Sequence, residues 1–263
     1  PGLAPTAVTT RESEALVTLS DGRRFAARLL IGADGRGSTV RQALGIGVRT
    51  LRYGQKALAF AVRHTIPHGN ISTEIHRSGG PFTFVPLPDQ DGQPCSAVVW
   101  MDHAAQIDRR MALPPEAFRE EMMTRSCGLL GELTQLSRLT AWPIIAQIAA
   151  QMSGERTALM AEAAHVMPPI GAQGLNMSLA DLTALFDLAE SHRADPGTAA
   201  VLAAYHRARH LDVQTRVMGI DLLNRASQIG AQPLRDLRAA TLDAMYSIAP
   251  VRKTLMRAGI GVR

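Results

Sequence analysis

The segment from Thr157 to Glu190 constrains the fold of this 263-residue chain more than any other. A short apolar run, Thr157 to Met160, predicts a buried strand that ends at the carboxylate of Glu162. A loop with two prolines and two glycines follows, and Asn176 then begins a predicted amphipathic helix. A strand, an acid, a glycine loop and a helix N-terminus in this order favour a site for an anionic cofactor in an α/β sheet. The predicted apolar side of the helix comprises Leu179, Leu182, Leu185, Phe186 and Leu188.

A second segment, from Leu29 to Arg41, repeats this order of strand, acid, glycines and helix, with Ser38 as the predicted N-cap. Because strands 29–33 and 157–161 both end at an acid, we expect them to be neighbours in one sheet, with both acids at one edge. For Asp34, a ligand contact and a turn that caps local N–H groups are equally favoured. For Arg41, a contact with a phosphate and an ion pair with a surface acid are equally favoured.

These two segments resemble the flavin-binding motifs of the FAD-dependent aromatic hydroxylases. One family motif reads Gly-Ala-Asp-Gly-x-x-Ser-x-Val-Arg, and residues 32–41 match it at every fixed position. The other reads Gly-Asp-Ala-Ala-His, a Pro, Gly-Gln-Gly-x-Asn and an Asp in the helix. The positions in register with it are Ala163, Ala164, His165, Pro169, Gln173, Gly174, Asn176 and Asp181. Ala161-Glu162 stands where the family has Gly-Asp, and Ala172 replaces the Gly before Gln173, with Gly171 one place earlier.

The resemblance implies a cofactor site and a reaction. The implied cofactors are FAD and NAD(P)H: NAD(P)H reduces FAD, O₂ adds at the flavin C4a, and one oxygen atom passes to a phenol. Glu162 would accept hydrogen bonds from ribityl hydroxyls, and the helix N-terminus at Gly174 would stabilise negative charge on the reduced flavin. His165 is interpreted as structural rather than as a base, and no catalytic residue is nominated. The predicted cofactor-binding residues are Asp34, Gly35, Glu162, Pro169, Gly171, Ala172, Gln173, Gly174, Leu175 and Asn176.

The resemblance also implies a fold class, α/β (α+β overall), and a division of the chain. The implied parts are a partial Rossmann-like FAD-binding domain (1–50, returning at 143–190), an antiparallel β-sheet substrate domain (51–142) and a C-terminal helical region (191–263). The family's first βαβ unit carries Gly-x-Gly-x-x-Gly, and these residues contain no such fingerprint. We therefore expect the chain to correspond to the C-terminal two-thirds of a hydroxylase.

Weaker motifs favour the ubiquinone-biosynthesis branch of this family. They are Gly80-Pro81-Phe82, Val98-Val99-Trp100, Tyr205 to Arg209 with Asp212, and Pro233-Leu234-Arg235. The implied substrate is a polyprenylated phenol, together with O₂. Two alternatives remain: a flavin hydroxylase of a small soluble aromatic, and a non-catalytic scaffold or partner subunit.

Composition excludes several other classes of protein. The net charge is +5, but the basic residues are interleaved with acids, and only 4% of residues are aromatic, which argues against a base-stacking nucleic-acid surface. Cys95 and Cys127 lack metal-type spacing, which favours free thiols, and no metal site is expected. No apolar stretch reaches the ~20 residues of a membrane span. We expect a cytoplasmic protein, with peripheral association at the inner membrane face or with a biosynthetic complex.

Local patterns predict the remaining elements. Residues 14–33 are expected to form a hairpin of Ala15–Leu19 and Phe25–Ile31, and residues 53–100 an antiparallel sheet with one face against the substrate. Residues 114–136 and 199–227 are expected to be helical, the latter with Tyr205, Leu211, Val217 and Leu222 in the core. Pro233 and Pro250 are expected to begin two further helices.

Overall fold

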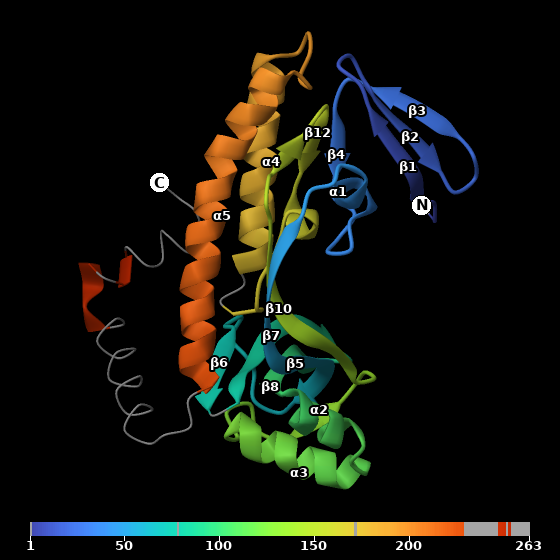
Figure 1. Ribbon diagram of the computed structural model, residues 1–263. Helices are drawn as coiled ribbons and strands as arrows, with labels where there is room; N and C mark the ends of the chain where they lie inside the picture. The colour runs from blue at the N-terminus through green and yellow to red at the C-terminus, as the bar shows by residue number, and fades with distance from the viewer. Residues whose placement is uncertain (1, 78, 171–172, 229–246, 251, 254–263) are drawn as a thin grey trace. The chain divides into compact units, whose positions relative to one another are not determined.

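The computed structural model describes residues 2–77, 79–170, 173–228, 247–250 and 252–253. The chain divides into two compact units (Figure 1). Unit 1 comprises Pro1–Leu51, Ile145–Asp221 and Met245–Arg263, and unit 2 comprises Arg52–Ile144 and Leu222–Ala244. Both contain helices and sheets, which confirms the α/β class. The assignment of flavin binding to 1–50 and 143–190, and of substrate binding to 51–142, stays a prediction.

Unit 1 contains two small sheets and two long helices. Its elements are β1 (Pro5–Thr10), β2 (Ala15–Leu19), β3 (Arg24–Ala27), β4 (Leu30–Gly32), α1 (Thr39–Ala43), β11 (Ser153–Gly154), β12 (Thr157–Leu159), the 3-10 helix η1 (Ala161–Ala163), β13 (His165–Val166), α4 (Gln173–Ser191) and α5 (Ala199–Gln228), whose last turns belong to unit 2. One sheet has the order β1-β2-β3 and the other β11-β12-β4. Strands β4 and β12 pair in parallel, as predicted.

Unit 2 is an antiparallel sheet covered by helices. Its elements are β6 (Thr73–Arg77), β7 (Gly80–Gln90), β8 (Gln93–His103), α2 (Ala104–Met111), α3 (Pro115–Ser126) and β9 (Leu133–Gln135), while β5 (Val48–His64) and β10 (Thr140–Ala149) run between the units. The sheet order is β13-β10-β5-β8-β7-β6, with β9 also on β5. The predicted antiparallel sheet over 53–100 is therefore confirmed.

Alternation along the strands of unit 2 produces its core. Phe82 pairs with Trp100 across β7 and β8, and Phe60 pairs with Val98 across β5 and β8, so these side chains share one face. Phe118 of α3 packs edge-on against Phe60, with ring centroids 5.5 Å apart. The two-residue turn Asp91-Gly92 joins β7 to β8 with φ of 52° and 73°, the conformation that an Asp-Gly hairpin favours.

Two predicted elements differ from the structure. The hairpin return predicted for 25–31 is two strands, because the chain leaves the hairpin after Ala27 and β4 pairs with β12 instead. The helix predicted for 114–136 ends at Ser126, since Cys127 adopts a left-handed φ of 56° and Gly128 follows, an arrangement that terminates helices. Strand β1 and helix α2 were not predicted at all.

The buried faces of the long helices also differ from prediction. On α4 the buried positions are Met177, Asp181 and Leu185, whereas Leu179, Leu182 and Phe186 are exposed. The apolar period located the helix and correctly included Leu185, but it grouped Leu185 with three exposed residues, because a polar residue occupies the centre of the buried side. On α5, Tyr205 and Val217 are buried as predicted, but Leu211 and Leu222 are exposed. The segment after Pro233 lies outside the described residues, as does most of the segment around Pro250.

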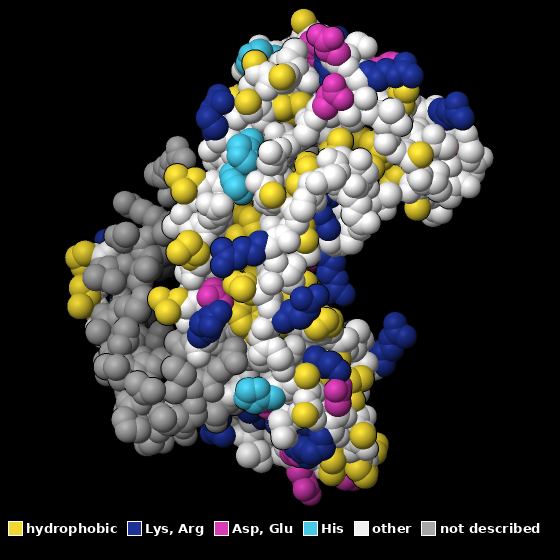
Figure 2. Space-filling view, in the orientation of Figure 1, with side chains coloured by type: hydrophobic (Ala, Val, Ile, Leu, Met, Phe, Trp, Pro, Cys, Tyr) yellow, Lys and Arg dark blue, Asp and Glu magenta, His cyan; other side chains and the backbone are white. Residues whose placement is uncertain are grey.

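The visible surface shows no concentration of one charge. On the face in Figure 2, Lys and Arg side chains are dispersed among acidic and apolar ones. Among the described residues, no helix is both long and apolar enough to cross a membrane.

Candidate functional site

The two sequence motifs meet at one edge of the β11-β12-β4 sheet. Thr157 to Leu159 pair in parallel with Leu30 to Gly32, and the Met160 N–H donates to the Gly32 carbonyl at 3.0 Å. Both strands therefore end at this edge, where Asp34 and Glu162 follow them, as predicted. Gly32 allows the close packing, because a Cβ there would lie 2.8 Å from Leu159 Cδ2.

Arg41 connects the two motifs directly. Its side chain is only 5% exposed, and it donates to the carbonyls of Ala163 at 2.7 Å and Arg36 at 2.9 Å. Burial lowers the pKa of Arg41, and the charge of Asp34 partly offsets that effect. The predicted surface ion pair is wrong, because the buried guanidinium holds the second motif's 3-10 helix against the first motif's loop. The alternative role, a phosphate contact, stays a prediction.

Asp34 acts as a local cap. Its carboxylate accepts hydrogen bonds from the Ser38 hydroxyl and from the Val40 N–H, the latter at 3.1 Å. The Ser38 hydroxyl oxygen in turn accepts from the Arg41 N–H at 2.9 Å, which confirms Ser38 as the N-cap. Of the two readings of Asp34, the geometry favours capping. Neighbouring Gly35 has a φ of 82°, which suits the tight turn after β4.

Buried side chains fix the backbone immediately before Glu162. The Tyr205 hydroxyl donates to the Leu159 carbonyl at 2.9 Å, and the Ala161 N–H donates to Asp181 at 3.0 Å. Burial raises the pKa of the Tyr205 phenol, so this hydroxyl stays a donor. Glu162 itself is exposed, and its carboxylate has no hydrogen bond or ion pair with any residue that the structure describes. The chain thus presents one uncommitted acceptor at a rigidly held position.

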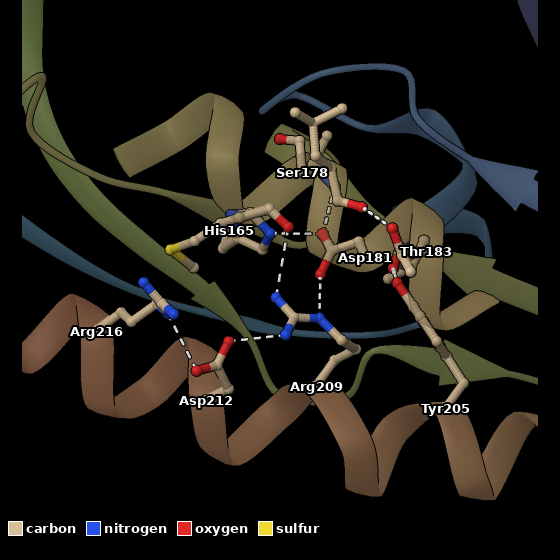
Figure 3. Close-up of polar contacts among 12 residues, drawn as sticks. His165, Ser178, Asp181, Thr183, Tyr205, Arg209, Asp212 and Arg216 are labelled. Carbon is tan, nitrogen blue, oxygen red and sulfur yellow. Dashed lines mark hydrogen bonds and ion pairs between the residues drawn. The ribbon is translucent and has the colours of Figure 1, made fainter. Parts of the chain in front are cut away.

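Asp181 is the centre of a buried polar network that links α4, α5 and the loop after β12. Its carboxylate, 0% exposed, accepts from His165 Nε2 at 2.7 Å and from Arg209 Nε at 2.8 Å (Figure 3). Arg209 also pairs with Asp212 at 2.7 Å, and Asp212 with Arg216 at 3.0 Å. Each charge is therefore compensated, as buried charges require.

The ionisation of this network follows from its pairing. Burial alone would lower the pKa of Arg209, but its bonds to Asp181 and Asp212 outweigh that effect and raise the pKa. Burial would likewise raise the pKa of Asp212, and the two arginines lower it instead. His165 is buried against Asp181, which agrees with the structural role predicted for it. The contacts of Asp181, Tyr205 and Arg209 were not predicted, although all three belong to motifs noted in the sequence.

The N-terminus of α4 completes the candidate site. Gly174 and Leu175 are exposed, and the first turn of the helix carries no acidic residue. The Gln173 side-chain oxygen Oε1 accepts from Arg216 Nη1 at 3.2 Å, so this side chain is held by α5. Pro169 is exposed and Asn176 half-buried in the same segment. Gly171 and Ala172 lie outside the described residues.

Ala161 occupies a strained backbone position, and replacing it with glycine tests that strain. Its φ of 52° lies in the left-handed region, which costs a residue with a Cβ about 1–2 kcal/mol. Glycine removes this cost but gives the unfolded chain about 0.4–1 kcal/mol more freedom. We expect Ala161→Gly to stabilise the protein by about 0.5–1 kcal/mol in urea unfolding.

The matched control for Ala161→Gly is Ala164→Gly. Ala164 has an ordinary right-handed conformation, so glycine there brings only a cost, and we expect destabilisation by about 1 kcal/mol. Equal destabilisation by both substitutions would show that residue 161 is not strained.

Comparisons with known proteins agree with this arrangement. A family model described as FAD binding domain matches residues 6–219. The Rhodospirillum rubrum protein named ubiquinone hydroxylase UbiL is 34% identical, covering 93% of this chain and 57% of that protein. The Escherichia coli 3-demethoxyubiquinol 3-hydroxylase is 29% identical, with 93% and 62% covered.

A solved structure shows the same fold. The p-nitrophenol 4-monooxygenase PnpA from Pseudomonas putida superposes with a TM-score of 0.79 at 17% identity, over 99% of this chain and 67% of that one. The chain spans about three fifths of the length of the two curated relatives. Because the family model matches well over half of its residues, this chain belongs to the FAD binding domain family.

Proposed function

We propose that this chain is the larger part of an FAD-dependent monooxygenase that hydroxylates a polyprenylated phenol in ubiquinone biosynthesis, with NAD(P)H as the reductant. The observation that carries the proposal is that unit 1 contains both the uncommitted Glu162 carboxylate, at the edge of the β11-β12-β4 sheet, and a helix whose first turn has no acidic residue. The names of the relatives support the substrate class, since both are hydroxylases of ubiquinone or its precursors.

The described residues fit the ribityl and ring side of FAD. Glu162 would accept hydrogen bonds from the ribityl hydroxyls, because its carboxylate is an acceptor that no described residue already uses. Gly174, Leu175 and Asn176 lie in the first turn of α4, and the positive end of the helix dipole there favours negative charge on a ligand. Pro169, Gly171, Ala172 and Gln173, which precede Gly174 in the chain, stay predicted cofactor-binding residues. Asp34 and Gly35 would act indirectly, because Asp34 already caps α1.

The protein's own contribution to the reaction is orientation and charge stabilisation. When bound, reduced FAD supplies the activation of O₂ and the transfer of oxygen. The contacts of Tyr205, Asp181 and Arg41 hold the loop on both sides of Glu162 without needing to move. Fixed donors at the N-terminus of α4 would stabilise negative charge with no reorganisation during the reaction. That one face of the 53–100 sheet lines the substrate pocket stays a prediction.

An assay with two substrate classes tests this function. The chain is joined behind the first βαβ unit of the Rhodospirillum relative, supplied with FAD and NAD(P)H, and given a polyprenylated phenol or a small soluble phenol. We expect hydroxylated product, detected by mass spectrometry, from the polyprenylated phenol. Turnover of only the soluble phenol would assign a soluble aromatic substrate, and turnover of neither, with FAD bound, would favour the non-catalytic subunit.

A matched pair of variants links the activity to the site. Glu162→Gln is expected to lower FAD affinity about tenfold, because a charge-assisted hydrogen bond is worth roughly 1.5–3 kcal/mol. Glu155→Gln, at the opposite end of β12 and exposed, is expected to leave FAD affinity unchanged. An effect of equal size in both would remove Glu162 from the site.

Peripheral association with a membrane, or with other enzymes of the pathway, would bring such a protein to a lipid substrate.

A further inference from the structure

Unit 2 contains a cavity outside both flavin motifs. Its volume is about 350 Å³, and it lies among the end of β6, strand β8 and helices α2 and α3. This is within the size range of pockets for small molecules. The charged and aromatic side chains that line it are Arg77, Trp100, Arg110, Glu120, Glu121 and Arg125.

Arg125 is buried in the wall of this cavity without a counter-ion. It is 8% exposed, and its Nη2 donates to the Gly80 carbonyl, while Nη1 is buried and has no partner among the described residues. No carboxylate of the described residues forms an ion pair with it. Burial, and then the charge of Arg77, lower the pKa of Arg125 to about 10, so the guanidinium is charged at neutral pH. A buried charge normally has a partner.

A second buried donor, the indole N–H of Trp100, also lacks a hydrogen-bond partner in the described part of the chain. Trp100 is 2% exposed, it lines the cavity, and its indole Nε1–H has no acceptor among the described residues. Arg110 lies over the indole ring, 4.3 Å from its centroid, so the ring face is covered while the N–H is unused. The two unpartnered buried atoms of this wall are therefore both donors. Such groups are rare in folded proteins, and a ligand that accepts hydrogen bonds would satisfy both.

Of the carboxylates near the cavity, Asp102 and Glu121 are already paired, whereas Glu120, which also lines it, forms no ion pair with a described residue. Arg110 binds Asp102 at 2.7 Å and Glu121 at 3.0 Å, and Arg109 binds both oxygens of Glu121 at 2.7 and 2.8 Å. Arg77 donates to the Cys127 sulfur at 3.0 Å and forms no ion pair with a described residue. Among the described residues, the lining therefore has three arginines against two glutamates, which leaves one positive charge at the cavity without a matching acid.

We propose that this cavity binds a small molecule through a phosphate or carboxylate group, with Arg125 and Trp100 as the buried donors and Arg77 at the exposed side. An oxyanion accepts charge-assisted hydrogen bonds from guanidinium and indole N–H groups and supplies the missing negative charge. Because all three residues belong to unit 2 and none to the flavin motifs, the proposal is independent of the proposed function.

Tryptophan fluorescence tests this site. The chain has two tryptophans, so Trp142→Phe leaves Trp100 as the sole reporter. Sodium phosphate and sodium acetate are each titrated against sodium chloride at constant ionic strength. We expect a saturable change in Trp100 emission with phosphate or acetate, and none with chloride. Preference for phosphate or for acetate identifies which oxyanion class the site takes. The absence of a saturable change with either would overturn the proposal.

Variants in the same background assign the response to the cavity. Arg125→Met is expected to weaken anion binding at least tenfold, whereas Arg119→Met, at an exposed position of the same helix, should leave it unchanged. If Arg125→Met does not fold by circular dichroism, Arg77→Met decides, with an expected loss of severalfold. If Arg125→Met folds and binds the anion with unaltered affinity, the proposal is contradicted. If Arg125→Met does not fold, unaltered anion affinity in Arg77→Met contradicts it.

Discussion

Replacing Asp181 with alanine is expected to destabilise unit 1 by about 3 kcal/mol, since removal of one partner of a buried ion pair costs roughly 3–5 kcal/mol. The substitution leaves Arg209 buried without its main partner and removes the acceptor of both His165 and the Ala161 N–H. Asp212 still pairs with Arg209, which places the expected loss at the lower end of that range. Urea unfolding, followed by circular dichroism, measures it.

Two further substitutions make this result specific. Asp187 lies on the same helix and is exposed, so Asp187→Ala should change stability by less than about 0.5 kcal/mol. Asp181→Asn keeps the shape and one acceptor oxygen, and should cost less than alanine. If Asp181→Ala unfolded at the same urea concentration as the native protein, the network would not be what fixes the loop around Glu162.

The sequence predicted the parts of the fold that depend on local patterns. Two apolar strands that end in an acid and precede a helix correctly indicated the parallel pair β4 and β12. Period-two alternation indicated the antiparallel sheet. Each of these signals is contained in a short stretch of consecutive residues, so it can be read without knowledge of the tertiary structure.

What the sequence could not predict depends on contacts between distant residues. Arg41 donates to a carbonyl 122 positions away, and nothing in its neighbourhood distinguishes this from a surface role. The buried side of α4 is centred on Asp181, so an argument from hydrophobic periodicity groups Leu185 with exposed residues. The break after Ala27 was missed because apolar residues stand on both sides of Arg28, and only the pairing of β4 with β12 reveals it.

The second large effect concerns cofactor affinity. These 263 residues contain no Gly-x-Gly-x-x-Gly fingerprint, the element whose helix N–H groups bind the FAD pyrophosphate. Only the ribityl and ring contacts of Glu162 and the 169–176 loop are then available. Each charge-assisted hydrogen bond to the pyrophosphate is worth roughly 1.5–3 kcal/mol. The absence of two such bonds lowers affinity about a hundredfold or more, so we expect the chain by itself to bind FAD weakly or not at all.

The central claim is that this chain supplies the ribityl and ring half of an FAD site, and FAD content on purification tests it most directly. The 263-residue chain and the same chain joined behind the first βαβ unit of the Rhodospirillum relative are purified in parallel, and FAD per protein is measured from visible absorbance. We predict a colourless 263-residue chain and a yellow extended protein with one FAD per chain. A folded extended protein without FAD, or a 263-residue chain that purifies with stoichiometric FAD, would contradict this account.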